Sequence, residues 1–60
     1  MPWNAVHYPP SMRNLPPVVR AKAIEIANAL LAGGTGEGMA IRVAIARARE
    51  WARRHLALAE

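Results

Sequence analysis

The side chains best suited to binding chemistry are arginines that recur along the C-terminal part of the sequence. They are Arg42, Arg47, Arg49, Arg53 and Arg54. A guanidinium group keeps its positive charge and donates paired hydrogen bonds, so these residues are candidates for contacts with the phosphates of a nucleic acid. Such contacts give an affinity that falls with salt and shows little sequence preference. The alternative is a solvated helix surface on which Glu50 pairs with arginines three and four residues away.

Other reactive side chains are scarce in this chain of 60 residues. It contains no cysteine and no aspartate, and Ser11 and Thr35 are its only hydroxyl side chains apart from one tyrosine. His7 and His55 lie far apart in the sequence, whereas a nucleophile, a base and an orienting acid must meet in one pocket. Two histidines also fall short of the three or four ligands that zinc requires. We therefore expect no enzyme activity and no bound metal or cofactor.

A helix predicted over residues 36–59 must position the arginines. Alanines spaced four residues apart line one side of it, and the arginines lie on the other side. The alanines are Ala40, Ala44, Ala48 and Ala52. Because alanine lets a second backbone come close, this helix should pack against a partner helix.

That partner is a helix predicted over residues 16–32, where apolar side chains repeat with the helical period. Its exposed side is expected to carry Lys22, Glu25, Asn28 and Ala29. The glycine-rich stretch 33–38 lacks the preceding strand and the lysine of a phosphate-binding loop, so we interpret it as an interhelical turn. Helices joined by so short a turn run antiparallel, and the predicted fold is therefore an all-α helical hairpin.

The first part of the chain, residues 1–15, should form an extended arm with a short turn. Its prolines disfavour a helix. The arm also carries Trp3, Val6 and Tyr8, which a freely solvated tail would not favour, so it should pack on the hairpin. Residues 1–60 are thus predicted to form one small domain.

A chain this short, with 13 alanines and no phenylalanine, can bury little apolar surface. The candidate core and oligomer contacts are Trp3, Tyr8, Val19, Ile26, Leu30, Ile41, Ala44, Ile45, Ala48, Trp51 and Leu56. Outside the seam between the helices lie the apolar residues Val18, Met39, Val43 and Leu58. Burying them would join two hairpins into a four-helix bundle, so we expect a homodimer.

The net charge of +4 at pH 7 permits contact with an anionic partner without specifying one. The apolar stretches are shorter than the ~20 residues that a membrane span needs. The start of the chain also lacks the basic and apolar regions of a signal peptide. A cytoplasmic location is therefore expected.

Several short patterns together resemble a group of bacterial proteins. They are Met1-Pro2-Trp3-Asn4, Tyr8-Pro9 with Ser11-Met12, Asn14-Leu15-Pro16, Ala23-Ile24-Glu25-Ile26-Ala27-Asn28-Ala29, Glu37-Gly38 with Ala40-Ile41, and Ala48 with Glu50-Trp51-Ala52. These patterns resemble the small YdaT-like proteins and, more distantly, the ChaB-like proteins, which are labelled cation transport regulators. The resemblance implies a small helical cytoplasmic protein, in some cases associated with general stress, and it brings no active site.

The function predicted from the sequence is a non-enzymatic, self-associating protein-interaction module. The alternative, from a different class, is non-specific nucleic-acid binding through the arginine-rich helix face. An interaction module should tolerate charge changes on that face and fail when its apolar residues are replaced, whereas a nucleic-acid-binding protein should do the reverse.

Overall fold

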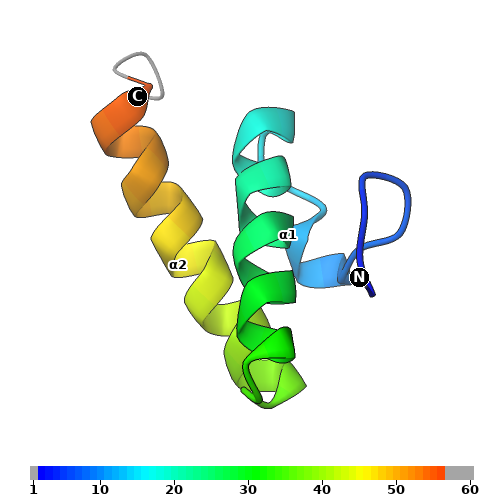
Figure 1. The fold of residues 1–60 in the computed structure, drawn as a ribbon. Helices are drawn as coiled ribbons and strands as arrows, with labels where there is room; N and C mark the ends of the chain where they lie inside the picture. The colour runs from blue at the N-terminus through cyan, green and yellow to red at the C-terminus, as the bar shows by residue number, and fades with distance from the viewer. Residues whose placement is uncertain (1, 57–60) are drawn as a thin grey trace.

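Two helices packed against each other form the body of the molecule, as the computed structural model of residues 2–56 shows (Figure 1). A short 3-10 turn, η1 (Pro10–Met12), precedes the helices α1 (Pro17–Ala32) and α2 (Glu37–His55). The helices run antiparallel, and the predicted all-α hairpin is confirmed. No helix among residues 2–56 combines the length and the hydropathy needed to cross a membrane.

The helix boundaries lie close to the predicted ones. The first helix, predicted over 16–32, begins one residue later, at Pro17. The N–H groups of the first helical turn have no intrahelical acceptor, so the N–H that proline lacks costs no hydrogen bond there. The second helix, predicted over 36–59, begins at Glu37 and ends at His55. The predicted C-terminal end, 57–59, lies outside the described residues, as does Leu58.

The turn between the helices depends on one glycine. Gly34 has a φ of 100°, in the left-handed region that other residues rarely adopt. Its N–H donates to the carbonyl of Leu31 at 3.0 Å, and the N–H of Thr35 donates to the carbonyl of Leu30 at 2.9 Å. This pair of bonds is the Schellman motif, which satisfies the last carbonyls of α1 and reverses the chain.

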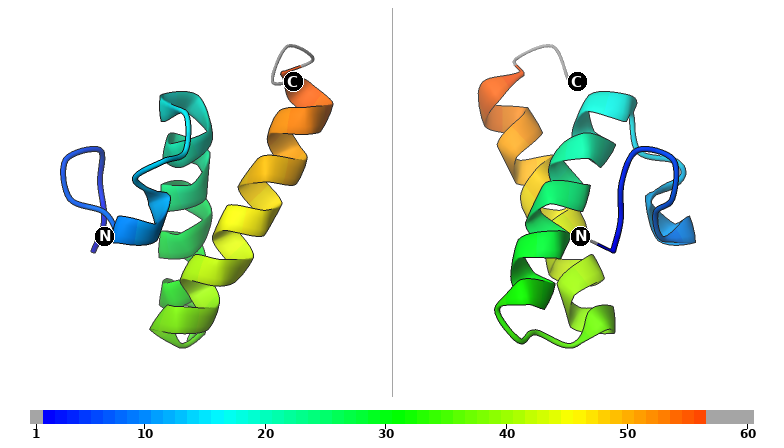
Figure 2. Two further views of the ribbon diagram at one scale, coloured as in Figure 1. Left: turned by 180° about the vertical axis from the view of Figure 1, so that it is seen from behind. Right: turned by 45° about the vertical axis from the view of Figure 1, so that its right-hand side comes forward.

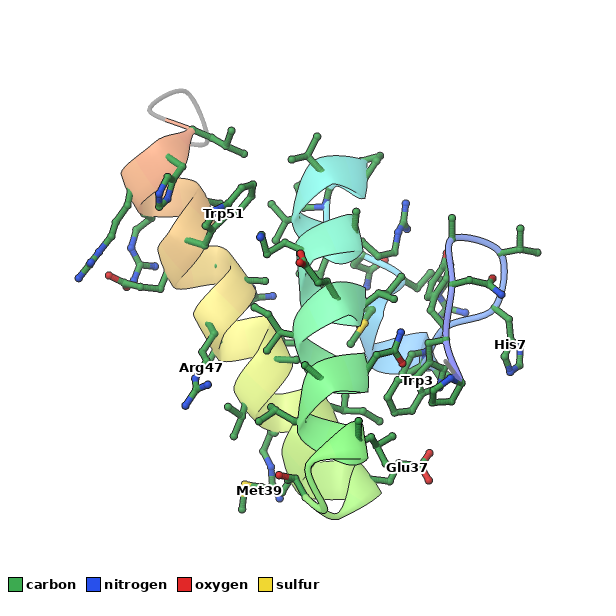
Figure 3. All side chains as sticks on the ribbon, in the orientation of Figure 1. Trp3, His7, Glu37, Met39, Arg47 and Trp51 are labelled. Atoms are coloured by element: carbon green, nitrogen blue, oxygen red, sulfur yellow. The ribbon has the colours of Figure 1, made fainter. Side chains whose placement is uncertain are left out.

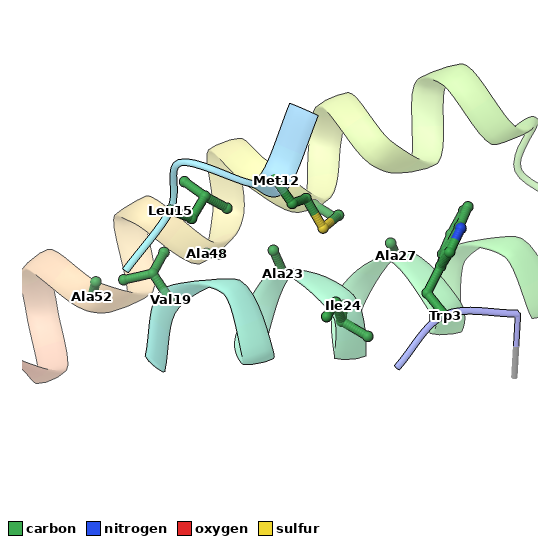
Figure 4. Packing of buried hydrophobic residues seen from close by; sticks show 10 residues of the cluster. Trp3, Met12, Leu15, Val19, Ala23, Ile24, Ala27, Ala48 and Ala52 are labelled. Carbon is green, nitrogen blue, oxygen red and sulfur yellow. The ribbon is translucent and has the colours of Figure 1, made fainter. Parts of the chain in front are cut away.

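α1 lies between the N-terminal arm and α2, so it is buried on two sides (Figures 1 and 2). The buried core cluster contains Trp3, Met12, Leu15, Val19, Ala23, Ile24, Ala27, Ala44, Ala48 and Ala52. Figure 4 shows Met12 and Leu15, which precede α1, close to the two helices. Met12 is the largest side chain that is fully buried.

The seam between the helices is built from alanine on the side of α2. The buried residues of this helix are the four predicted alanines, Ala40, Ala44, Ala48 and Ala52. The neighbouring Ile41 and Ile45 are only half-buried. Such small side chains let the two backbones approach closely, but they bury little apolar area.

The prediction that Asn28 lies on the exposed side of α1 is wrong, because only 5% of this residue is exposed. The arm covers this side of the helix, where Ile24, one turn earlier, is also buried. A polar residue was expected to face solvent, and the structure instead uses it as a hydrogen-bonding partner for the arm.

Candidate interaction surfaces

The arm is held by the side-chain amide of Asn28. Its Oδ1 accepts from the backbone N–H of Trp3 at 3.3 Å, and its Nδ2 donates to the carbonyl of Trp3 at 3.0 Å. Further along the arm, the guanidinium of Arg20 lies 4.8 Å from the centre of the Tyr8 ring and donates to the Tyr8 hydroxyl at 3.2 Å. These contacts fix the arm to one side of α1. The arm is not fully extended as predicted, because it bends at residues 5–7, where the N–H of Asn4 donates to the carbonyl of His7 at 2.8 Å.

A third side of α1, which neither the arm nor α2 buries, continues onto α2 as a surface that we call the open face. Its residues are Val18, Lys22, Ile26, Leu30, Val43, Arg47 and Trp51. They recur four residues apart on each helix. The Lys22 Nζ lies 4.9 Å from the centre of the Trp51 ring, which joins the two helices at this face. Val18 is 54% exposed, and Ile26, Leu30, Val43 and Trp51 are half-buried. The open face is therefore largely apolar and incompletely covered.

The open face carries charges of both signs at its margin. Lys22 pairs with Glu25 at 3.0 Å, and the Glu25 side chain is 69% exposed. On α2, Arg47 points away from α1 in Figure 3 and is exposed. Next to it, the ring of Trp51 is stacked on His55, with centroids 5.6 Å apart.

The outer side of α2, facing away from the alanines, carries a second surface, which we call the arginine stripe. Its residues are Met39, Arg42, Ala46, Arg49 and Arg53. All of them are exposed, and their spacing alternates between three and four residues, so they form a nearly straight line along the helix. Arg54 and Arg47 are also exposed but lie on the flank nearer the open face.

Glu50 engages two of the arginines. Its carboxylate accepts hydrogen bonds from Arg53 and, at 3.0 Å, from Arg54. The positive charge of Arg53, together with the hydrogen bonds from Arg54 and Arg53, lowers the pKa of the Glu50 carboxyl below its usual value. Among the described residues, Arg42, Arg47 and Arg49 form no such ion pair.

The structure thus places the predicted nucleic-acid contacts on one helix, at the surface, and along its two edges, as their spacing predicts. A carboxylate also lies beside the row, where it would repel phosphate. Whether these arginines contact a nucleic acid stays a prediction.

The predicted core and oligomer contacts divide into groups by burial. Trp3, Val19, Ala44 and Ala48 belong to the buried cluster, and Tyr8, Ile26, Ile41, Ile45, Trp51 and Leu56 pack against it while half-buried. Leu30 is half-buried as well. Their role in an oligomer stays a prediction.

Sequence reasoning missed two residues that organise the structure, Asn28 and Met12. Asn28 follows Ile24 by four residues, and this spacing could have placed both on one buried side. Met12 lies in a proline-flanked turn without periodicity, so no comparable pattern signals its burial.

The described residues offer little that could form a catalytic or metal site. No group of three histidine, cysteine, aspartate or glutamate side chains among residues 2–56 could hold a metal ion. His7 and His55 are exposed on different parts of the fold, in the arm and at the end of α2.

Comparison with known proteins gives one close likeness. No family model matches the chain. No solved structure matches it either. The predicted, more distant resemblance to ChaB-like proteins therefore finds no support. The sequence is 52% identical over 52 residues to a protein of Bacillus subtilis (strain 168) named uncharacterized protein YdaT. The match covers 87% of this chain but only 35% of that protein's length, so the predicted resemblance to YdaT is confirmed for one part of the longer relative.

Proposed function

We propose that this chain is a non-enzymatic interaction module that self-associates through its open face. The observation that carries the proposal is the incomplete burial of apolar side chains there. Val18 is 54% exposed, and Val43 and Trp51 are half-buried, although the chain has few large apolar residues that could form a core. Covering them with a second hairpin would enlarge that core, which is a common solution for chains of this size.

The charges at the open face fit a second copy. Glu25 lies on α1 and Arg47 on α2, so a two-fold axis through the face could bring Glu25 of one copy near Arg47 of the other. The same symmetry would pack the two helices of one hairpin against the two helices of the other, which gives a four-helix bundle. A surface with both signs of charge avoids the repulsion that two like faces would otherwise meet.

Sedimentation velocity at micromolar concentration tests the proposal with two matched valine variants. The wild-type chain should sediment with the mass of two chains. Val18→Glu should weaken the dimer by at least about tenfold, because it places a carboxylate in an apolar contact. Val18 is exposed and lies in the first turn of α1, where a carboxylate favours the helix, so the hairpin itself should stay folded.

Val6→Glu is the control, because Val6 is 92% exposed in the arm and lies outside the open face. This variant should sediment as the wild type does. The proposal is wrong if the wild-type chain has the mass of one chain, or if both substitutions change the mass equally.

A further inference from the structure

The arginine stripe is the strongest feature of the molecule that self-association leaves unused. It lies on the side of α2 opposite the alanine seam, and every member is exposed, with Met39 at 52%. Figure 3 shows Met39, at one end of the stripe, projecting away from α1. Any partner that contacts this side of α2 would therefore leave the seam undisturbed.

The spacing of the stripe matches a helical partner. Positions that alternate by three and four residues face one straight neighbour along a helix, as the contact positions of coiled coils do. Ala46, at the centre, has only a methyl group and lets another backbone come close, while Met39 supplies an adaptable apolar contact at one end.

The charge of the stripe decides what kind of helix fits. Arg42, Arg49 and Arg53 are all positive, and no stripe position is acidic. A second copy of the same stripe would bring like charges together, which opposes association. A helix with carboxylates in the same repeat would pair with them, since Arg42 and Arg49 are two turns apart, about 10.5 Å along the axis.

We propose that the arginine stripe docks an acidic amphipathic helix of a partner protein. Apolar residues of that helix lie over Met39 and Ala46, and its glutamates or aspartates accept hydrogen bonds from Arg42 and Arg49. A nucleic acid fits less well, because phosphates make no use of the apolar side chains of Met39 and Ala46.

The probe for this proposal is a synthetic helical peptide of 21 residues. It repeats leucine and glutamate at alternating three- and four-residue spacing, and a control peptide carries lysine in place of each glutamate. Fluorescence anisotropy with the full chain should give a micromolar dissociation constant for the glutamate peptide and no binding of the lysine peptide. Circular dichroism of each variant should first show an unchanged helix content.

Replacing Arg42 and Arg49 together by glutamine should lower the affinity for the glutamate peptide about tenfold. This is the combined effect expected from losing two exposed ion pairs. Arg13→Gln is the matched control, since Arg13 is exposed before α1 and far from the stripe in the sequence, and it should leave the affinity unchanged. Neither change touches the open face, so dimerisation should persist in both.

Four results would overturn the proposal. The glutamate peptide could fail to bind even when the protein concentration is about 100-fold above the expected micromolar dissociation constant. Alternatively, the lysine peptide could bind equally well. Arg13→Gln could weaken binding as much as the double substitution, which would indicate a diffuse charge effect. Finally, a duplex DNA added as competitor could displace the peptide and lose its own affinity in the double variant, which would assign the stripe to nucleic acid.

Discussion

The two sides of α1 are buried in different ways. Toward α2, the buried side chains of the partner helix are all alanines. Toward the arm, the partners include Trp3, which is 8% exposed, and the side chain of Asn28 bonds its backbone. Both sides exclude water from α1, but the side chains that do so differ greatly in size.

The alanine seam and the arm therefore have different structural roles: the seam sets the spacing of the helices, and the arm supplies buried apolar area. The alanine seam sets the distance between α1 and α2, since small side chains allow a close approach. The arm adds bulky apolar area, and burial of an aromatic ring contributes far more than burial of a methyl group. The arm is therefore part of the core rather than an appendage, while the outer sides of α2 stay free for binding.

The largest effect should come from removing the bulk on the arm side. Trp3→Ala should lower the free energy of unfolding by about 3–5 kcal/mol, as other buried aromatic residues do. Trp51→Ala should cost less, because Trp51 is half-buried and stacks on His55 near the end of α2. Urea denaturation of both variants measures the difference, and an equal or larger loss for Trp51→Ala would contradict the comparison.

The seam should respond to added volume rather than to lost volume. Ala48→Leu should destabilise the hairpin by about 1–3 kcal/mol, because Ala48 has no exposed surface and its neighbours leave no room. Ala46→Leu is the control on the same helix, since Ala46 is exposed. Thermal unfolding followed by circular dichroism should show a clear loss for the first variant only, and equal melting temperatures would show that the seam is loosely packed.

These residues also show where sequence reasoning succeeds. The alanine seam and the turn at Gly34 could be predicted, because four-residue spacing and paired glycines are local patterns with direct physical meaning. The exposure of the arginines follows from the same periodicity. The burial of Met12 could not be predicted, because this residue lies in a turn without periodicity. The hydrogen bonds of Asn28 to Trp3 could not be predicted either, because they join residues 25 positions apart in the sequence.

The smallest effect concerns Glu50 at the surface. Arg53 holds its pKa below the usual value, so replacing Arg53 and Arg54 by glutamine should raise that pKa toward the ordinary range. Because the folded-state pKa is the lower one, the stabilisation is present at neutral pH and is lost as the pH falls through it. Carbon-13 NMR titration of the Glu50 carboxyl measures the shift, and an unchanged midpoint would show that the ion pairs do not persist in solution.

Amide hydrogen exchange at Trp3 tests most directly the claim that the arm belongs to the core. The Trp3 N–H donates to a buried acceptor on Asn28, whereas the Ala5 N–H, in an exposed part of the arm, has no hydrogen-bond acceptor among residues 2–56. Exchange at Trp3 should be slower than at Ala5 by at least about a hundredfold after correction for intrinsic rates, and Asn28→Ala should remove most of that protection. Equal exchange at the two amides would contradict the account, because the arm would then leave α1 as readily as a free tail.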